Sequence, residues 1–77
     1  MTRHELRLRC AEFYVDLHLI EHQSRWLAVA HTPDGPSMGW GAQWFNATIM
    51  ALQPFDGRIT ELMSDISPRQ QRENTGG

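Results

Sequence analysis

Alternating apolar and polar residues dominate the first third of the chain. Leu6, Leu8 and Cys10 alternate with arginines, and a second run from Phe13 to Leu19 alternates with polar residues. A period of two is typical of half-buried strands. The apolar positions are even-numbered in the first run and odd-numbered in the second, so one flat strand would place them on opposite faces. The pattern therefore predicts a break or a bulge near Ala11–Glu12.

The same residues also fit a helix. Thr2–Glu5 matches a capping box, and apolar residues recur from Leu6 to Ile20 at spacings of three and four. Periodicity alone leaves strand and helix open for residues 3–20.

Turn-forming residues divide the middle of the chain into further strands. Glu21–Ser24 is polar and suits a four-residue loop. Arg25–His31 follows as a strand with apolar side chains on both faces, which is typical of a central strand or of one that a partner covers. Thr32–Ser37 is rich in Pro, Asp and Gly, the residues of tight turns. Met38–Gly41 then fits a short third strand, whose glycines allow a backbone or a ligand to approach closely.

Helical spacing replaces the alternation after Gly41. Ala42–Gln53 carries an apolar stripe and predicts the clearest helix of the chain, and Pro54 ends it. Asp56 is placed to cap a second, short helix that continues to Ile66.

These elements predict one α+β domain over residues 1–66 and a disordered C-terminal tail over residues 67–77, where aliphatic and aromatic side chains are missing. The expected architecture is a two- to three-stranded antiparallel sheet, built on a β-hairpin, that packs against one long and one short C-terminal helix. A core this small is marginal, so we expect a homodimer or a larger assembly, for which exposed strand edges offer one route.

The stretch from the second strand to the helix has a recognisable order. The strand Trp26–Ala30 leads to Pro33–Pro36, then to Gly39 and Gly41, and then to a helix that carries Ala47 and Ala51-Leu52. In this order Tyr14 to Leu52 resembles the HicB-like antitoxin family. Gly41-Ala42-Gln43 stands where that family has Gly-Asp-Thr, so the helix lacks the expected threonine cap.

The resemblance implies strands over residues 14–20 and a domain that acts by protein–protein contact. In the family such a domain binds and masks a small RNA-cleaving toxin, which makes a small toxin the expected partner. The segment from Asp56 to Ile66 is too short for the family's DNA-binding unit and has no basic face.

Composition narrows the function classes. The net charge of −2 gives no general attraction to nucleic acid. A single cysteine, Cys10, excludes a disulfide within the chain. The first ten residues are charged throughout and no apolar run is long enough for a bilayer, so a cytoplasmic protein without membrane contact is expected.

Candidate contact residues gather around the Gly-rich turn. Trp40 and Trp44 flank Gly41, and Gly39 precedes them. Tryptophan is enriched at interface hot spots, so these four residues are the predicted partner-binding site. Trp40 is the expected exposed anchor.

The sequence signals for metal binding, catalysis and RNA binding are weaker. His18 and His22 are four residues apart but have no clear third ligand, so no metal or other cofactor is predicted. No catalytic constellation can be assembled, and we expect no enzyme. Two alternatives stay open: an RNA-binding module that uses an arginine face, Arg3, Arg7 and Arg9, and a small inhibitor of a host or phage defence system. The terminal Gly76-Gly77 also resembles the end of ubiquitin-like modifiers.

Overall fold

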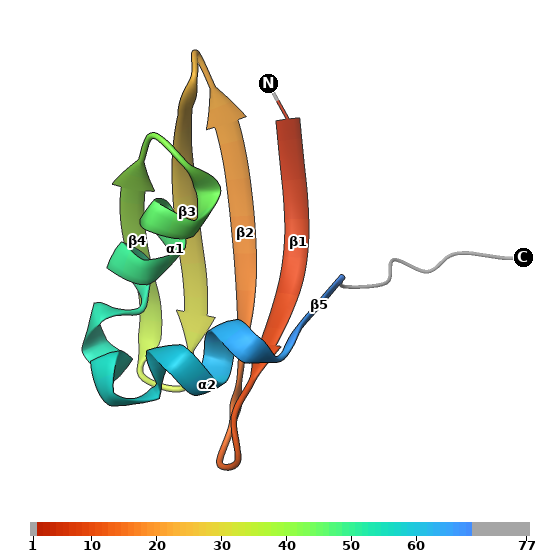
Figure 1. Cartoon of the computed structure of the whole chain (residues 1–77), viewed down its shortest axis with the longest axis vertical. Helices are drawn as coiled ribbons and strands as arrows, with labels where there is room; N and C mark the ends of the chain where they lie inside the picture. Colours follow the sequence, from red (N-terminus) through yellow and green to blue (C-terminus); the bar gives the residue numbers. More distant parts are fainter. Residues whose placement is uncertain (1, 69–77) are drawn as a thin grey trace, which may run out of the picture.

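A five-stranded antiparallel sheet with helices on one face forms the molecule (Figure 1). The computed structural model describes residues 2–68. Its strand order is β4-β3-β2-β1-β5. The elements in chain order are β1 (Thr2–Arg9), β2 (Tyr14–His22), β3 (Arg25–Thr32), β4 (Gly35–Gly41), α1 (Trp44–Ala51), η1 (Gln53–Arg58, a 3₁₀ segment), α2 (Ile59–Ser64) and β5 (Ile66–Pro68).

The predicted α+β class is confirmed, but the predicted sheet of two to three strands is wrong. The first third of the chain forms two strands, β1 and β2, and the helical alternative for residues 3–20 fails. The chain reverses at Cys10, whose amide donates to the Phe13 carbonyl at 2.9 Å. In the resulting register Leu6 faces Leu17 and Leu8 faces Val15. The change from even to odd apolar positions therefore marks a hairpin, which puts both sets on the same face.

The turn between β2 and β3 is tighter than expected. His22 already pairs with Arg25, so Gln23 and Ser24 alone span the turn in place of a four-residue loop. Both residues have positive φ, 53° and 64°, as the commonest two-residue hairpin turn requires.

The Pro-Asp-Gly turn joins β3 to β4 as predicted. Thr32 pairs with Gly35 across Pro33 and Asp34, and Gly35 supplies the positive φ of 111°. The Thr32 hydroxyl accepts from the Asp34 amide at 3.1 Å and donates to the Gly35 carbonyl at 2.6 Å. These bonds hold a turn from which β4 extends further than the sequence suggested.

The helical region is more broken than expected. The helix predicted over Ala42–Gln53 is shortened to the eight residues of α1, and no side-chain hydrogen bond caps its start at Gln43. Pro54 lies near the start of η1, and Asp56 lies inside that segment without capping α2. The expected pair of one long and one short helix is thus replaced by two short helices and a 3₁₀ segment.

The chain end returns to the sheet. Ser67 and Pro68, assigned to the tail by the sequence, belong to β5, which pairs with β1. Residues 69–77, including Gly76-Gly77, lie outside the described residues, as does Met1. Within the described part of the chain no helix is long and apolar enough to cross a bilayer.

The core lies between the sheet and the helices. Its buried apolar residues come from β1, β2, β3 and both α-helices, and they are Leu8, Val15, Leu17, Leu19, Ala28, Ala30, Ala47, Ala51, Leu52 and Leu62. Alanines form the contact between β3 and α1, so the helix lies close to the sheet. The approach is closest over β4, where a Cβ on Gly39 would overlap the Ala47 carbonyl oxygen and lie 2.5 Å from the Ala51 amide nitrogen.

We expect Gly39→Ala to destabilise the domain by about 2 kcal/mol, because the added methyl group has no space between β4 and α1. Denaturant unfolding monitored by circular dichroism measures the change. Gly57→Ala is the matched control, since a Cβ there meets no atom within 4 Å, and it should alter the free energy of unfolding by less than about 0.5 kcal/mol. Equal effects of the two substitutions would contradict the close helix–sheet contact.

Candidate functional site

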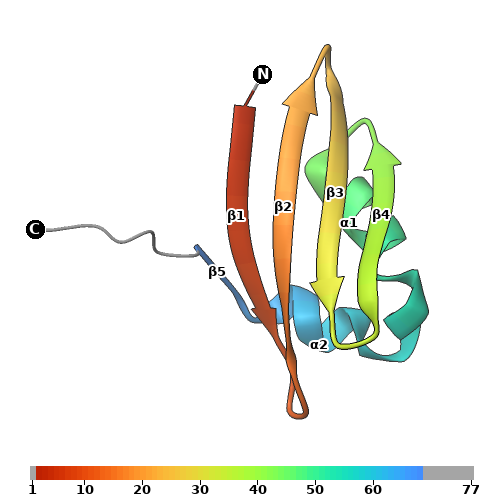
Figure 2. The same cartoon turned by 180° about the vertical axis from the view of Figure 1, so that it is seen from behind.

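The second face of the sheet is the candidate site. Figure 2 shows this side, with α1 and α2 lying behind the strands. Because side chains alternate along a strand, this open face carries the residues that alternate with the buried ones. We define its apolar half as Ile20, Leu27, Val29, Met38 and Trp40, which come from β2, β3 and β4. Met38 and Trp40 expose 57% and 51% of their surface, so a large apolar patch faces solvent.

The other half of the open face is polar and carries charges of both signs. We define this polar half by Arg3, Glu5, Arg7, Tyr14, Asp16, His18 and His31, from β1, β2 and β3. The predicted arginine face is therefore present on β1, although Arg9 lies where that strand ends. The open face joins this arginine face to apolar residues that lie far from it in sequence.

Arg7 is held in place within the polar half. Its Nε and Nη2 donate to the two carboxylate oxygens of Asp16 at 2.8 and 3.2 Å, and its guanidinium lies 4.1 Å from the centre of the Tyr14 ring. The hydrogen bonds to Asp16 raise the pKa of Arg7 above its ordinary value, against a smaller opposing effect of desolvation. Arg7 is thus a fixed positive charge whose hydrogen-bonding capacity is partly used.

Two hollows run along the open face and share Ile20. The first, of about 220 Å³, is lined by Arg3, His4, Glu5, His18, Leu19, Ile20, Val29 and His31. The second, of about 400 Å³, is lined by Ile20, His22, Gln23, Arg25, Leu27 and Trp40. They connect the polar half with the apolar half, so one bound segment can contact both.

The histidines of the open face lie in two separate places. His18 lies 3.6 Å from Glu5, measured from Nδ1 to Oε2, and its ring meets that of His31 edge-on at 4.9 Å. His22 shares the open face with His18 but lines the other hollow. Among residues 2–68 no group of three His, Cys, Asp or Glu side chains could hold a metal ion.

Cys10 is half-buried in the first hairpin turn, with its Sγ 3.8 Å from the Glu12 carboxylate.

The four predicted partner-binding residues are divided between the two faces. Trp40 lies on the open face, as an exposed anchor should. Gly39 and Gly41 lie under α1, where the backbone that approaches them closely is the helix itself. Trp44 lies on the helix side and lines a hollow with Trp26, His4, Leu6 and Leu19. The sequence missed Ile20 as a neighbour of Trp40, because only the strand register brings the two together through Leu27. Met38 lies two residues before Trp40 on β4, so the alternation of a strand could have placed it on the same face.

The outer edge of β4 is protected from pairing with another strand. The Trp40 amide donates to the Met50 Sδ at 3.5 Å, so this amide points away from β3. Pro36 is separated from Trp40 by an even number of residues on the same strand, so its nitrogen points the same way. Proline has no amide hydrogen to donate there. Both features weaken the β4 edge as a route to assembly.

Charge is divided between the two sides of the molecule. Alternation places four arginines on the open face, Arg3, Arg7, Arg9 and Arg25, against two carboxylates, Glu5 and Asp16. The remainder of residues 2–68 carries one arginine, Arg58, against six carboxylates, Glu12, Glu21, Asp34, Asp56, Glu61 and Asp65. The open face is therefore positive although the chain has a net charge of −2.

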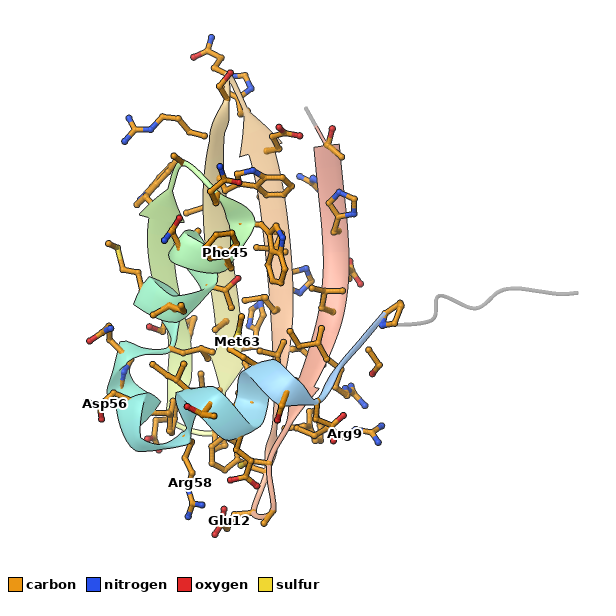
Figure 3. The ribbon with its side chains drawn as sticks, in the orientation of Figure 1. Arg9, Glu12, Phe45, Asp56, Arg58 and Met63 are labelled. Atoms are coloured by element: carbon orange, nitrogen blue, oxygen red, sulfur yellow. The ribbon has the colours of Figure 1, made fainter. Side chains whose placement is uncertain are left out.

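Some charged residues of the helix side form ion pairs and hydrogen bonds within the molecule. Arg58 binds the Glu12 carboxylate at 2.7 Å and that of Glu61 at 3.3 Å, and Glu61 accepts from the Ala11 amide at 2.7 Å. Figure 3 shows Arg58 directed toward Glu12 at the tip of the first hairpin. These contacts fasten the hairpin to the helices.

Comparison of the chain with protein-family models, with curated proteins and with solved structures found no match.

The division of the tryptophans between the two faces predicts different effects on stability. Trp40→Ala should lower the free energy of unfolding by about 1–2 kcal/mol, because half of the side chain is already in water. Trp44→Ala should lower it by about 3 kcal/mol, because Trp44 packs against the core. Urea unfolding of both variants tests this order, and a larger loss for Trp40→Ala would contradict the assignment of the faces.

Proposed function

We propose that this chain is a protein-binding domain and that another protein docks on its open face. The observation that carries the proposal is the apolar half, where Met38 and Trp40 are more than half exposed on a regular sheet surface. Burial of apolar surface contributes about 25 cal/mol per Å², and tryptophan is a frequent centre of interface energy. A partner that covers the apolar half would place Trp40 near the centre of its contact.

The rigidity of the open face supports this proposal. Its side chains project from β2, β3 and β4, which are paired along most of their length. A site on paired strands is already ordered before binding, so little conformational entropy is lost when a partner docks.

An antitoxin-like role is a second candidate function, which rests on the sequence resemblance and uses a different contact surface. In that role the partner is a small RNA-cleaving toxin, whose RNA-binding surface must be cationic to hold a polyanion. Electrostatic complementarity would direct such a surface to the acidic helix side, around Asp56 and Glu12, and away from the open face (Figure 3). The two candidate functions therefore predict different contact surfaces.

Met38→Glu should remove partner binding, because it places a charge in the apolar half without altering the core. The measurement is affinity capture from cells of the native host, with captured proteins quantified by mass spectrometry. Phe45→Glu is the matched control, since Phe45 is 43% exposed but lies on α1, on the helix side. We expect a specific partner that the wild type and Phe45→Glu retain and that Met38→Glu loses.

Two other outcomes have a clear meaning. A partner that all three proteins retain would contradict docking on the open face. A captured ribonuclease that survives Met38→Glu but is lost on Asp56→Lys would support the antitoxin-like role and its acidic contact surface instead.

A further inference from the structure

We infer that the open face binds an acidic amphipathic segment of its partner, in which an apolar stripe is flanked by carboxylates. This inference rests on the proposed function and adds the chemistry of the partner. It is carried by the arrangement of two different surfaces on one face: the apolar half on β3 and β4, and the arginines on β1.

The charge distribution of the chain favours a partner segment with negative charge. The open face carries more arginines than carboxylates, and Arg3, Arg9 and Arg25 make no ion pair within residues 2–68. The remainder of the described chain is acidic, so the cationic surface is confined to this face. Complementary charge steers encounter and suppresses wrong partners, and carboxylates are the groups that arginine binds with matching geometry.

The spacing of the strands sets how the two kinds of contact are arranged. β1 and β4 are three strand positions apart in the sheet order, which is roughly 14 Å at the usual strand separation. That width is close to the diameter of a helix with its side chains, about 10–12 Å. A segment laid across the two hollows, which meet at Ile20, would place apolar side chains near Leu27 and Trp40 and carboxylates near Arg3 and Arg25.

The side chains of the open face favour protein over nucleic acid. Single-stranded nucleic acid binds where aromatic rings, on which bases stack, lie beside cationic groups. Here the residues between Trp40 and the β1 arginines are mainly aliphatic, as with Leu27 and Val29. Tyr14, the one tyrosine of the chain, already has the Arg7 guanidinium over its ring at 4.1 Å. One face of that ring is therefore already used by Arg7.

A second copy of the chain fits this face poorly. Two open faces brought together would oppose cationic surfaces, because their arginines outnumber their carboxylates. The β4 edge, where strand pairing could join two sheets, is protected by Pro36 and by the Met50 contact to the Trp40 amide. A partner with carboxylates satisfies both halves of the face without these conflicts.

The experiment selects ligands from a random peptide library displayed on phage, with the full chain immobilised. We expect the enriched peptides to combine Asp or Glu with large apolar residues. Synthetic copies of the enriched peptides are then titrated while amide shifts of the chain are recorded by NMR, and the shifts should concentrate on β3, β4 and the first half of β1. Raising the salt from about 50 to about 300 mM should weaken binding, because exposed charge pairs are screened.

Matched variants separate the charge of the open face from the charge of the whole chain. Arg3→Gln with Arg25→Gln should weaken peptide binding by about tenfold. Gln43→Glu with Gln53→Glu changes the net charge by the same amount on the helix side, where both glutamines are exposed, and should alter binding by less than about twofold.

Each alternative result overturns the inference in a different way. Enriched peptides that are neutral or basic, or no enrichment, would remove the acidic partner. If Met38→Glu still abolishes binding of such neutral or basic peptides, only the acidic-partner inference fails and the proposed docking on the open face survives. If Met38→Glu leaves their binding unchanged, the inference and the proposed docking face both fail. Tighter binding of single-stranded poly(U) RNA, lost in the arginine variant, would identify nucleic acid as the ligand. Sedimentation that shows a dimer dissociated by Met38→Glu would identify a second copy.

Discussion

The contact between α1 and the backbone of β4 determines the rest of this structure. Gly39 has no side chain, so the helix lies directly on the strand, with the Ala47 carbonyl and the Ala51 amide over it. Ala28 and Ala30 continue the same close contact onto β3. A helix held this near the sheet assigns one face to the core. The other face, with Leu27 and Trp40, is then left to solvent, and its apolar character becomes a functional feature instead of a packing one.

The open face combines surfaces that the chain keeps far apart. Arginines from β1 and apolar residues from β3 and β4 become neighbours only through the antiparallel registers of β2 with β1 and of β3 with β2. Most of the other carboxylates lie in turns or in the helical region. The small net charge of the chain therefore hides a molecule with two electrically different sides, and an account based on net charge alone would miss the cationic one.

Sequence patterns predicted the type of most elements but not their number or their register. The alternation in residues 3–20 indicated strands, yet Leu6, Cys10 and Leu17 also fitted a helical stripe, and only pairing with a neighbouring strand decides between the two. Gly39 and Gly41 were correctly identified as sites of close approach. However, a missing Cβ does not say whether a helix or a ligand approaches. Trp40 was predicted as exposed, whereas Ile20 could not be assigned beside it, since their proximity depends on three strands in register.

The position of β5 has a consequence for how the chain folds. Leu8 of β1 pairs with Ile66, and Arg9 donates its amide to the Asp65 carbonyl at 3.1 Å. The second half of β1 is thus paired with β5, which lies near the other end of the described chain. Contacts between such distant segments form late, since the entropy of closing a long loop must be overcome first. During synthesis the β1 edge stays open until residue 68 has left the ribosome, so the nascent domain has an exposed strand to shield for most of its time on the ribosome.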